Sequence, residues 1–151
     1  MDLKNLKKEI PFKWRVQSTN EYGASCVAYI DSRDVQDLLD EVCGAENWQD
    51  RFEEHKGNLF CSIGIQVNGE WIWKSDCGTE SQVEKQKGES SDAFKRAAVM
   101  WGVGRFLYSK KIVKLPVKQE NNKWIPFSEK TQRFVKSGEM ITQWCNLLTK
   151  K

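Results

Sequence analysis

The dipeptide Asn68-Gly69 constrains the fold of this chain more than any other feature of its sequence. It stands between two runs of strand-forming residues, at 59–67 and 71–74, and such a dipeptide favours the backbone angles of a two-residue hairpin turn. A third extended run, at 48–56, precedes them. The sequence therefore predicts a meander of about three antiparallel strands between residues 47 and 80.

Further elements are expected on both sides of this meander. Apolar and polar residues alternate at 12–17, which predicts a strand, and β-forming residues predict a second strand at 24–30, with shorter extended pieces at 112–117 and 124–127. Apolar residues at helical spacing predict a helix that is capped by Ser32, runs to about Cys43 and stops at Gly44. Two more helices are expected at 90–108 and, after a cap by Ser128, at 128–148. The predicted fold class is α+β, a curved antiparallel sheet with helices packed on one face.

The length of 151 residues suits one domain, so residues 1–151 are expected to form a single unit with residues 1–10 as a short lead-in. No run reaches the roughly 18 apolar residues that a membrane span needs. The first nine residues are charged and lack an apolar core, which argues against secretion. The chain has 7 Trp, which predicts a large aromatic core, an interface or a stacking surface.

Five cysteines form an odd set without any Cys-x-x-Cys spacing. Most of them stand in apolar company, so we interpret them as small buried side chains of a protein from a reducing compartment. A zinc site or a Cys-His nucleophile pair would depend on His55, the only histidine. His55 lies in a strongly polar run at 52–57, so we interpret it as a solvated residue at a strand end.

The net charge of +3 conceals two blocks of opposite sign. Residues 31–54 contain nine acidic residues against two basic, a net of −7, and residues 87–118 contain eight basic residues against two acidic, a net of +6. A basic segment with interleaved aromatic residues is the composition that a phosphate-tracking surface needs. Either block can also be a solvated face, and the acidic block can instead meet the basic block of a neighbouring subunit.

The predicted helix at 90–108 separates an apolar stripe from a polar face. The stripe repeats at helical spacing and consists of Phe94, Ala97, Trp101, Gly104 and Tyr108. At about 100° per residue, Asp92, Lys95, Arg96 and Val99 fall in a sector that faces away from it. Asp92 and Arg96 are spaced i, i+4 with the acid first, the favourable order for a helix salt bridge, which can also hold Arg96 in place for phosphate. Gly102 and Gly104 indicate tight packing or a bend.

Two segments around this helix resemble a known family. Residues 76–80 read Asp-Cys-Gly-Thr-Glu and residues 87–97 read Lys-Gly-Glu-Ser-Ser-Asp-Ala-Phe-Lys-Arg-Ala. In this order they resemble the Rad52/Rad22 family of single-strand annealing proteins, especially its short phage and bacterial members. Residues 14–17, 27–30, 44–48 and 101–105 fit the same pattern, so the likeness covers residues 12–112. The resemblance implies a β-β-β-α core and ATP-independent pairing of complementary strands in recombination and repair.

The resemblance also implies which residues bind DNA. The Lys-Arg pair of the family falls on Lys95 and Arg96, and a basic residue before the helix falls on Lys87. The family also carries an arginine at the start of its first core helix, and this position aligns one residue away from Arg33. Val99 stands where eukaryotic members carry a further arginine. Arg105 and Lys110 are candidates to replace that positive charge. The implied DNA-binding set is Lys95, Arg96, Lys87, Arg105, Arg33 and Lys110.

The implied partners are single-stranded DNA, further copies of the chain in a ring or helical filament, and a host or phage single-strand-binding protein. The implied location is the cytoplasm of a bacterial or phage-infected cell, at the nucleoid and without a membrane. Lys and Arg suit the annealing task because they bind phosphate and leave the base edges free. The sequence contains no Gly-x-x-x-x-Gly-Lys-[Ser/Thr] phosphate loop, so no nucleotide or other cofactor is expected, and the chain is not expected to be an enzyme.

Two alternatives remain open at this point. Asp76, Glu80 and Glu84, close to Lys85, are spaced so that they can hold Mg²⁺ in a metal-dependent nuclease. A structural or RNA-binding module can use the same basic groove. Metal-independent annealing of single strands distinguishes the DNA-annealing hypothesis from both.

Overall fold

The computed structural model describes residues 1–78 and 85–150, and for residues 85–87 it describes the backbone alone. Within this part of the chain the fold is α+β, as predicted, with three α-helices and three small antiparallel sheets. None of the described helices is long and apolar enough to cross a lipid bilayer. The contacts divide the chain into two compact units, residues 1–10 with 30–106 and residues 11–29 with the part from residue 107 onward. That the chain forms a single domain stays a prediction.

The first unit contains the predicted meander. β3 (Trp48–His55), β4 (Asn58–Val67) and β5 (Glu70–Cys77) pair in this order, and both pairings are antiparallel. Asn68 and Gly69 join β4 to β5 with φ of 53° and 82°, the two positive angles that a type I′ hairpin turn requires. The hairpin and the three strands are confirmed.

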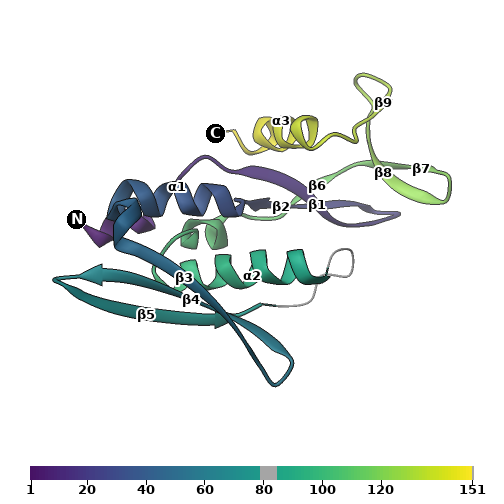
Figure 1. Cartoon of the computed structure of the whole chain (residues 1–151). Coiled ribbons are helices and arrows are strands. Elements are labelled where there is room, and N and C mark those ends of the chain that lie inside the picture. The colour runs from purple at the N-terminus through teal and green to yellow at the C-terminus, as the bar shows by residue number, and fades with distance from the viewer. Residues whose placement is uncertain (79–84, 151) are drawn as a thin grey trace. The chain divides into compact units, whose positions relative to one another are not determined.

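The helix α2 (Lys85–Met100) lies along one face of this sheet (Figure 1). Cys61, Ile63 and Ile65 alternate along β4 and are buried, as expected for a strand with one covered face, whereas Gly64 is buried beneath the ring of Trp73 on the opposite face. The predicted β-β-β-α order is therefore present in β3, β4, β5 and α2, while the curvature of the sheet stays a prediction. The buried residues of the two elements are Cys61, Ile63, Gly64 and Ile65 of β4 and Ala93, Phe94, Ala97 and Ala98 of α2.

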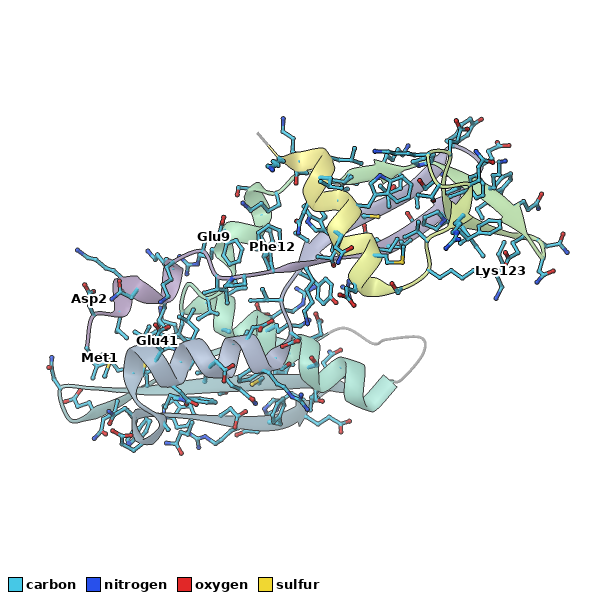
Figure 2. The ribbon with its side chains drawn as sticks, turned by 90° about the horizontal axis from the view of Figure 1, so that it is seen from above. Met1, Asp2, Glu9, Phe12, Glu41 and Lys123 are labelled. Carbon is cyan, nitrogen blue, oxygen red and sulfur yellow. The ribbon has the colours of Figure 1, made fainter. Side chains whose placement is uncertain are left out.

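The helix α1 (Ser32–Cys43) lies on the same side of this sheet as α2 and forms as predicted, except for its cap. Asp31, not Ser32, is the N-cap, and Asp31 and Asp34 form a reciprocal capping box. Gly44 ends the helix with a φ of 90° and leads into the short 3₁₀ helix η2 (Ala45–Asn47). The lead-in forms another 3₁₀ helix, η1 (Leu3–Lys7), beside Glu41 of α1 (Figure 2). Glu41 forms an ion pair with Lys8 at 2.9 Å.

The helix α2 differs from the predicted 90–108 helix at both ends. It begins at Lys85 and stops at Met100, and a 3₁₀ helix, η3 (Arg105–Ser109), follows after a turn. Gly102 and Gly104 adopt φ of 107° and 84°, which a continuing right-handed helix excludes. The two glycines therefore mark the bend that their sequence indicated. Tyr108, which was expected to continue the apolar stripe, is 79% exposed.

The second unit is built around a sheet in the order β1 (Lys13–Asn20), β2 (Gly23–Tyr29) and β6 (Val113–Leu115). The helix α3 (Gly138–Thr149) packs on β1. Trp14 is buried at this contact, where its indole donates a hydrogen bond to Asn146 at 3.0 Å and its backbone N–H donates to Thr142 at 3.0 Å. Trp14 thus serves as a core residue and not as a stacking surface.

The last helix starts ten residues later than the 128–148 prediction. Ser128 ends β8 (Lys123–Ser128), which pairs with β7 (Val117–Glu120) and with β9 (Arg133–Phe134). The turn between β8 and β9 contains Gln132 at a φ of 58°, which breaks any helix there. Ser137 is the actual N-cap of α3, because its hydroxyl accepts a hydrogen bond from the backbone N–H of Met140 at 3.1 Å.

Gly78 sets how closely α2 approaches the sheet. Its backbone N–H donates to the carbonyl of Leu59 at 2.9 Å, and the N–H of Leu59 donates to the Glu89 carboxylate at 3.0 Å. A Cβ at residue 78 would meet the backbone carbonyl oxygen of Glu89 and would lie 3.0 Å from Cβ of Ala93. Only a residue without a side chain fits between β5 and α2 at this point.

We predict that Gly78→Ala destabilises the fold by about 1–3 kcal/mol, because backbone has to move to make room. Gly138→Ala is the matched control, since Gly138 has no atoms within 4 Å of the added methyl group and starts a helix. The control should be neutral or slightly stabilising. Urea unfolding curves measure both variants. Equal stabilities would show that α2 does not approach the sheet this closely.

The five cysteines carry free thiols, as expected. Burial raises the pKa of the buried thiols, to about 12 for Cys61, where the charge of Asp50 adds to the effect, and to about 12 for Cys145, which lies beside Cys26. Cys77 is the only one of the five that is half-buried. Four of the five cysteines are therefore the small core residues that the sequence predicted.

We predict that a thiol reagent at pH 8 modifies Cys77 first in the folded protein. Cys61 and Cys145 stay protonated up to a pH near their pKa of about 12, and only the thiolate reacts. All five thiols should react once the protein is unfolded in guanidinium. The time course of Ellman's reagent, with Cys77→Ser as the control, measures this. Rapid reaction of several thiols in the Cys77→Ser variant would contradict the burial of the other four.

Candidate nucleic-acid interface

Lys95 and Arg96 lie on the part of α2 that is not buried against the sheet. Arg96 is exposed and Lys95 is half-buried, whereas Phe94 and Ala97 beside them are buried. Nζ of Lys95 lies 3.5 Å from the carbonyl oxygen of Ile30, the residue before the N-cap of α1. The structure thus presents two adjacent cations on a helix that is held by its other face.

The predicted ion pair between Asp92 and Arg96 is confirmed. Nε of Arg96 donates to Oδ2 of Asp92 at 3.0 Å, and both side chains keep part of their surface in water. Such an exposed i, i+4 pair contributes only about 0.3–0.5 kcal/mol. The pair therefore orients the guanidinium without contributing much to the stability of the fold.

Arg33 lines a pocket at the start of α1 that reaches the N-terminal half of α2. The hydroxyls of Ser32 and Ser91 lie 2.8 Å apart and join the two helices there. The capping box at this end of α1 uses the backbone N–H groups of Asp31 and Asp34, and its two carboxylates place negative charge at the helix terminus. The pocket has a volume of about 470 Å³ and is lined by Asp31, Ser32, Arg33, Gln36, Asp50, Phe52, Ser90, Ser91 and Phe94.

The remaining basic residues of the predicted set lie in different places. The backbone of Lys87 belongs to α2, and its side chain lies outside the described part of the chain. Arg105 follows the turn after α2 and donates to the carbonyl oxygens of Val99 at 2.8 Å and Met100 at 3.0 Å. Lys110 belongs to the second unit, where its ammonium lies 5.1 Å from the ring of Phe12. The first unit therefore contains Arg33, Lys95, Arg96 and Arg105, of which only Lys95 and Arg96 are adjacent on α2.

The residues of the nuclease alternative are only partly described. Asp76 is half-buried at the end of β5, and its carboxylate accepts a hydrogen bond from the N–H of Cys77 at 2.7 Å. Glu80 and Glu84 and the side chain of Lys85 lie outside the described residues. Among the side chains that are described, no group of three or more His, Cys, Asp or Glu is placed to hold a metal ion.

Sequence reasoning missed a second basic cluster in the first unit. Lys4 and Lys7 of η1, Lys74 of β5 and Arg105 line one pocket of about 320 Å³ at the C-terminal end of α2. The register of the predicted meander could have placed one of these residues. Lys74 pairs with Ile63 and so faces the side of the sheet that α2 covers. Nothing in the sequence shows that η1 meets this end of α2.

The sequence analysis also did not identify the aromatic cluster on the outer face of the meander. Arg51 stacks over the ring of Trp73 with its guanidinium carbon 3.7 Å from the centroid, and Trp71 lies beside Trp73 with the rings 6.3 Å apart. The ring of Trp73 lies over Gly64, where an added Cβ would come within 2.8 Å of it. Two of the seven tryptophans therefore form an aromatic surface on the side of the sheet away from α2.

Comparison with known proteins identifies a matching family. The model of the Rad52/22 family of double-strand break repair proteins matches residues 2–124, which include both core helices and the whole meander. The chain belongs to this family. The resemblance inferred from the sequence is thus confirmed, and family membership connects the chain to double-strand break repair.

Two curated relatives are both named single-stranded DNA-binding protein DdrA. The protein from Deinococcus deserti is 36% identical over 101 residues, which cover 66% of this chain and 50% of the relative. The protein from Deinococcus radiodurans is 34% identical over 87 residues, which cover 56% of this chain and 41% of the relative. The matched region thus spans half of these relatives or less.

We predict that Asp92→Asn lowers the stability of the folded protein by only about 0.3–0.5 kcal/mol in low salt. The difference from the unmodified protein should shrink in 1 M salt, where the Debye length is about 3 Å. Urea unfolding at the two salt concentrations measures both effects. A salt-independent decrease of about 2 kcal/mol or more would mean that the pair supports the fold itself.

Proposed function

We propose that this chain binds single-stranded DNA along the exposed face of α2 and anneals complementary strands without ATP, as an oligomer. The observation that carries the proposal is the adjacent pair Lys95 and Arg96 on a helix whose other face is buried. Membership of the double-strand break repair family and relatives that are named single-stranded DNA-binding proteins support it.

The chemistry of the face favours backbone contacts. Lys and Arg bind phosphate by charge and carry no information about the base sequence. A strand that is held by its phosphates keeps its base edges free for a second strand. Binding should therefore depend weakly on sequence and strongly on salt, because each phosphate contact releases counterions.

Pairing itself supplies the free energy for annealing. Base stacking in a duplex contributes about 1.4 kcal/mol for each step, so two complementary strands need only to be brought together in an open form. No nucleotide has to be hydrolysed for this, and the sequence contains no phosphate loop of the Gly-x-x-x-x-Gly-Lys-[Ser/Thr] type.

Assembly of several subunits would turn weak contacts into tight binding. One subunit offers only a few cations at α2, and binding sites that are linked in a row gain affinity through effective concentration. Exposed apolar side chains in the first unit, Phe52, Trp71, Ile72 and Met100, offer surface for contacts between copies. A ring, a helical filament and a single-strand-binding protein of the host or a phage as a partner remain predictions.

The double variant Lys95→Ala with Arg96→Ala tests the site. The fold should remain nearly intact, because surface substitutions usually stay within about 0.5 kcal/mol. Affinity for a labelled oligo-dT strand should fall sharply, and the slope of log affinity against log salt should flatten by roughly 0.7 for each phosphate that the variant no longer binds. Annealing, followed by fluorescence energy transfer between complementary strands, should fall in parallel.

The matched control is Lys130→Ala with Arg133→Ala, which removes the same two residue types from exposed positions in the second unit. If both double variants weaken binding equally, the effect is one of net charge and the site does not lie on α2. The same assays with Mg²⁺ and with RNA strands test the alternatives. Cleavage of the strand would favour the nuclease, and a preference for RNA would favour an RNA-binding module.

We predict a mass of several times 17.6 kDa in light scattering at micromolar protein concentration, with or without DNA. The physical reason is that the exposed apolar side chains of the first unit and the two blocks of opposite charge offer surfaces for contacts between copies. A monomeric mass that added single strands leave unchanged would contradict the oligomer and leave the placement of the site on α2 to the variants above.

A further inference from the structure

The basic pocket at the C-terminal end of α2 is separate from the Lys95 and Arg96 pair. Its volume is about 320 Å³, and its lining includes four cations that come from three distant segments of the chain. Lys4 and Lys7 belong to η1, Lys74 belongs to β5, and Arg105 begins η3. Lys4, Lys7 and Arg105 are exposed, so water screens part of their mutual repulsion, and a bound anion would lower the rest.

Two of the four cations are fixed by the end of α2. Arg105 donates to the carbonyl oxygens of Val99 and Met100, and Nζ of Lys74 lies 3.4 Å from the carbonyl oxygen of Met100. The ammonium of Lys74 also lies 4.7 Å from the ring of Trp101, whose indole N–H donates to the carbonyl of Ile63 at 2.9 Å. These contacts hold Lys74 and Arg105 in place before any ligand arrives.

The other two cations are brought in by η1. Residues three apart eclipse each other in a 3₁₀ helix, so Lys4 and Lys7 share one side of η1. Leu6, between them, is fully buried and anchors this helix. Gly102 lets the stem of Lys7 cross the turn after α2, because a Cβ at residue 102 would lie 2.7 Å from Cγ of Lys7. The φ of 107° at Gly102 also excludes most other residues there.

The charges inside the pocket are not balanced. Its lining, within the described residues, contains no carboxylate. The C-terminal end of α2 provides a partial negative charge of about one half, which is small against four cations. The nearby carboxylate of Glu41 is paired with Lys8, which is not a lining residue. Met100 and Trp101 add an apolar wall beside the cations.

The geometry points to a phosphate-binding pocket at the C-terminal end of α2, formed by Lys4, Lys7, Lys74 and Arg105. Met100, which lines the pocket, follows Arg96 by four residues and so lies about 6 Å further along the same face of the helix. A single strand that contacts Arg96 can therefore place a neighbouring phosphate in the pocket. This second contact rests on the proposed function, whereas the affinity of the pocket for a phosphate group does not.

The test uses Lys4→Gln with Lys7→Gln, because Lys74 and Arg105 also cap α2 and glutamine keeps most of the stem that covers Gly102. Lys123→Gln with Lys130→Gln is the matched control, since both lysines are exposed and belong to the second unit. Affinity for oligo-dT should fall severalfold in the first variant only. Its salt slope should flatten by roughly 0.7 for each phosphate that the pocket no longer holds.

A second measurement follows the indole N–H of Trp101 by NMR, with Trp101→Phe to assign the peak. The peak should shift when inorganic phosphate alone is added, and this shift should be lost in the Lys4→Gln with Lys7→Gln variant. That result supports the pocket even if the chain fails to bind single strands. A shift with oligo-dT, but not with inorganic phosphate, identifies the phosphate as that of a strand. If neither ligand shifts the peak and the variant binds oligo-dT like its control, the pocket proposal is overturned while the site on α2 can still stand.

Discussion

The contact between α2 and the central strand β4 is the constraint on which the rest of the first unit depends. Small residues of the helix, Ala93, Ala97 and Ala98, are buried together with Phe94, and alternate residues of β4 are buried opposite them. Truncating a buried Phe typically costs about 3–5 kcal/mol, whereas truncating an exposed Arg changes stability by no more than about 0.5 kcal/mol. The burial therefore fixes the rotation of the helix, and the cations of its other face can serve binding at little cost in stability.

Both ends of α2 are fixed by specific close approaches. At the N-terminal half, Gly78 leaves room for the backbone of Glu89, whose carboxylate accepts a hydrogen bond from Leu59. At the C-terminal end, the indole of Trp101 bonds to the carbonyl of Ile63 in the same sheet. A helix that is held at both ends keeps its exposed side chains at constant positions, which a surface that orders a strand requires.

Most of the first unit could be predicted from the sequence because its elements are fixed locally. The hairpin follows from the positive angles that Asn68 and Gly69 tolerate, and α1 follows from apolar spacing and a stop at Gly44. The errors arose where two local preferences compete. The apolar spacing continues through Trp101 to Tyr108, but Gly102 and Gly104 take positive angles and end α2. Serine is a favourable N-cap residue, but Ser128 pairs with Arg133 in the ladder of β8 and β9. Ser137 is therefore the residue that caps α3.

The arrangement of the candidate site residues was predictable only where they share one helix. The angular positions of Asp92, Lys95 and Arg96 follow from helical geometry alone, and their ion pair forms as expected. The pocket at the other end of α2 joins Lys4, Lys74 and Arg105, which are separated by long stretches of chain, so no sequence spacing reveals it.

The pairing of Arg96 with Asp92 also bears on how an annealing surface would work. A carboxylate next to the guanidinium competes with phosphate, so each contact is weaker than that of an unpaired arginine. Weak single contacts favour annealing, because a strand that is bound tightly at each phosphate would be slow to move into register with its complement. The acidic side chains Asp31 and Asp50 that line the pocket with Arg33 weaken attraction there in the same way. Affinity would then come from the number of subunits along the strand, and the paired duplex could be released as individual contacts open.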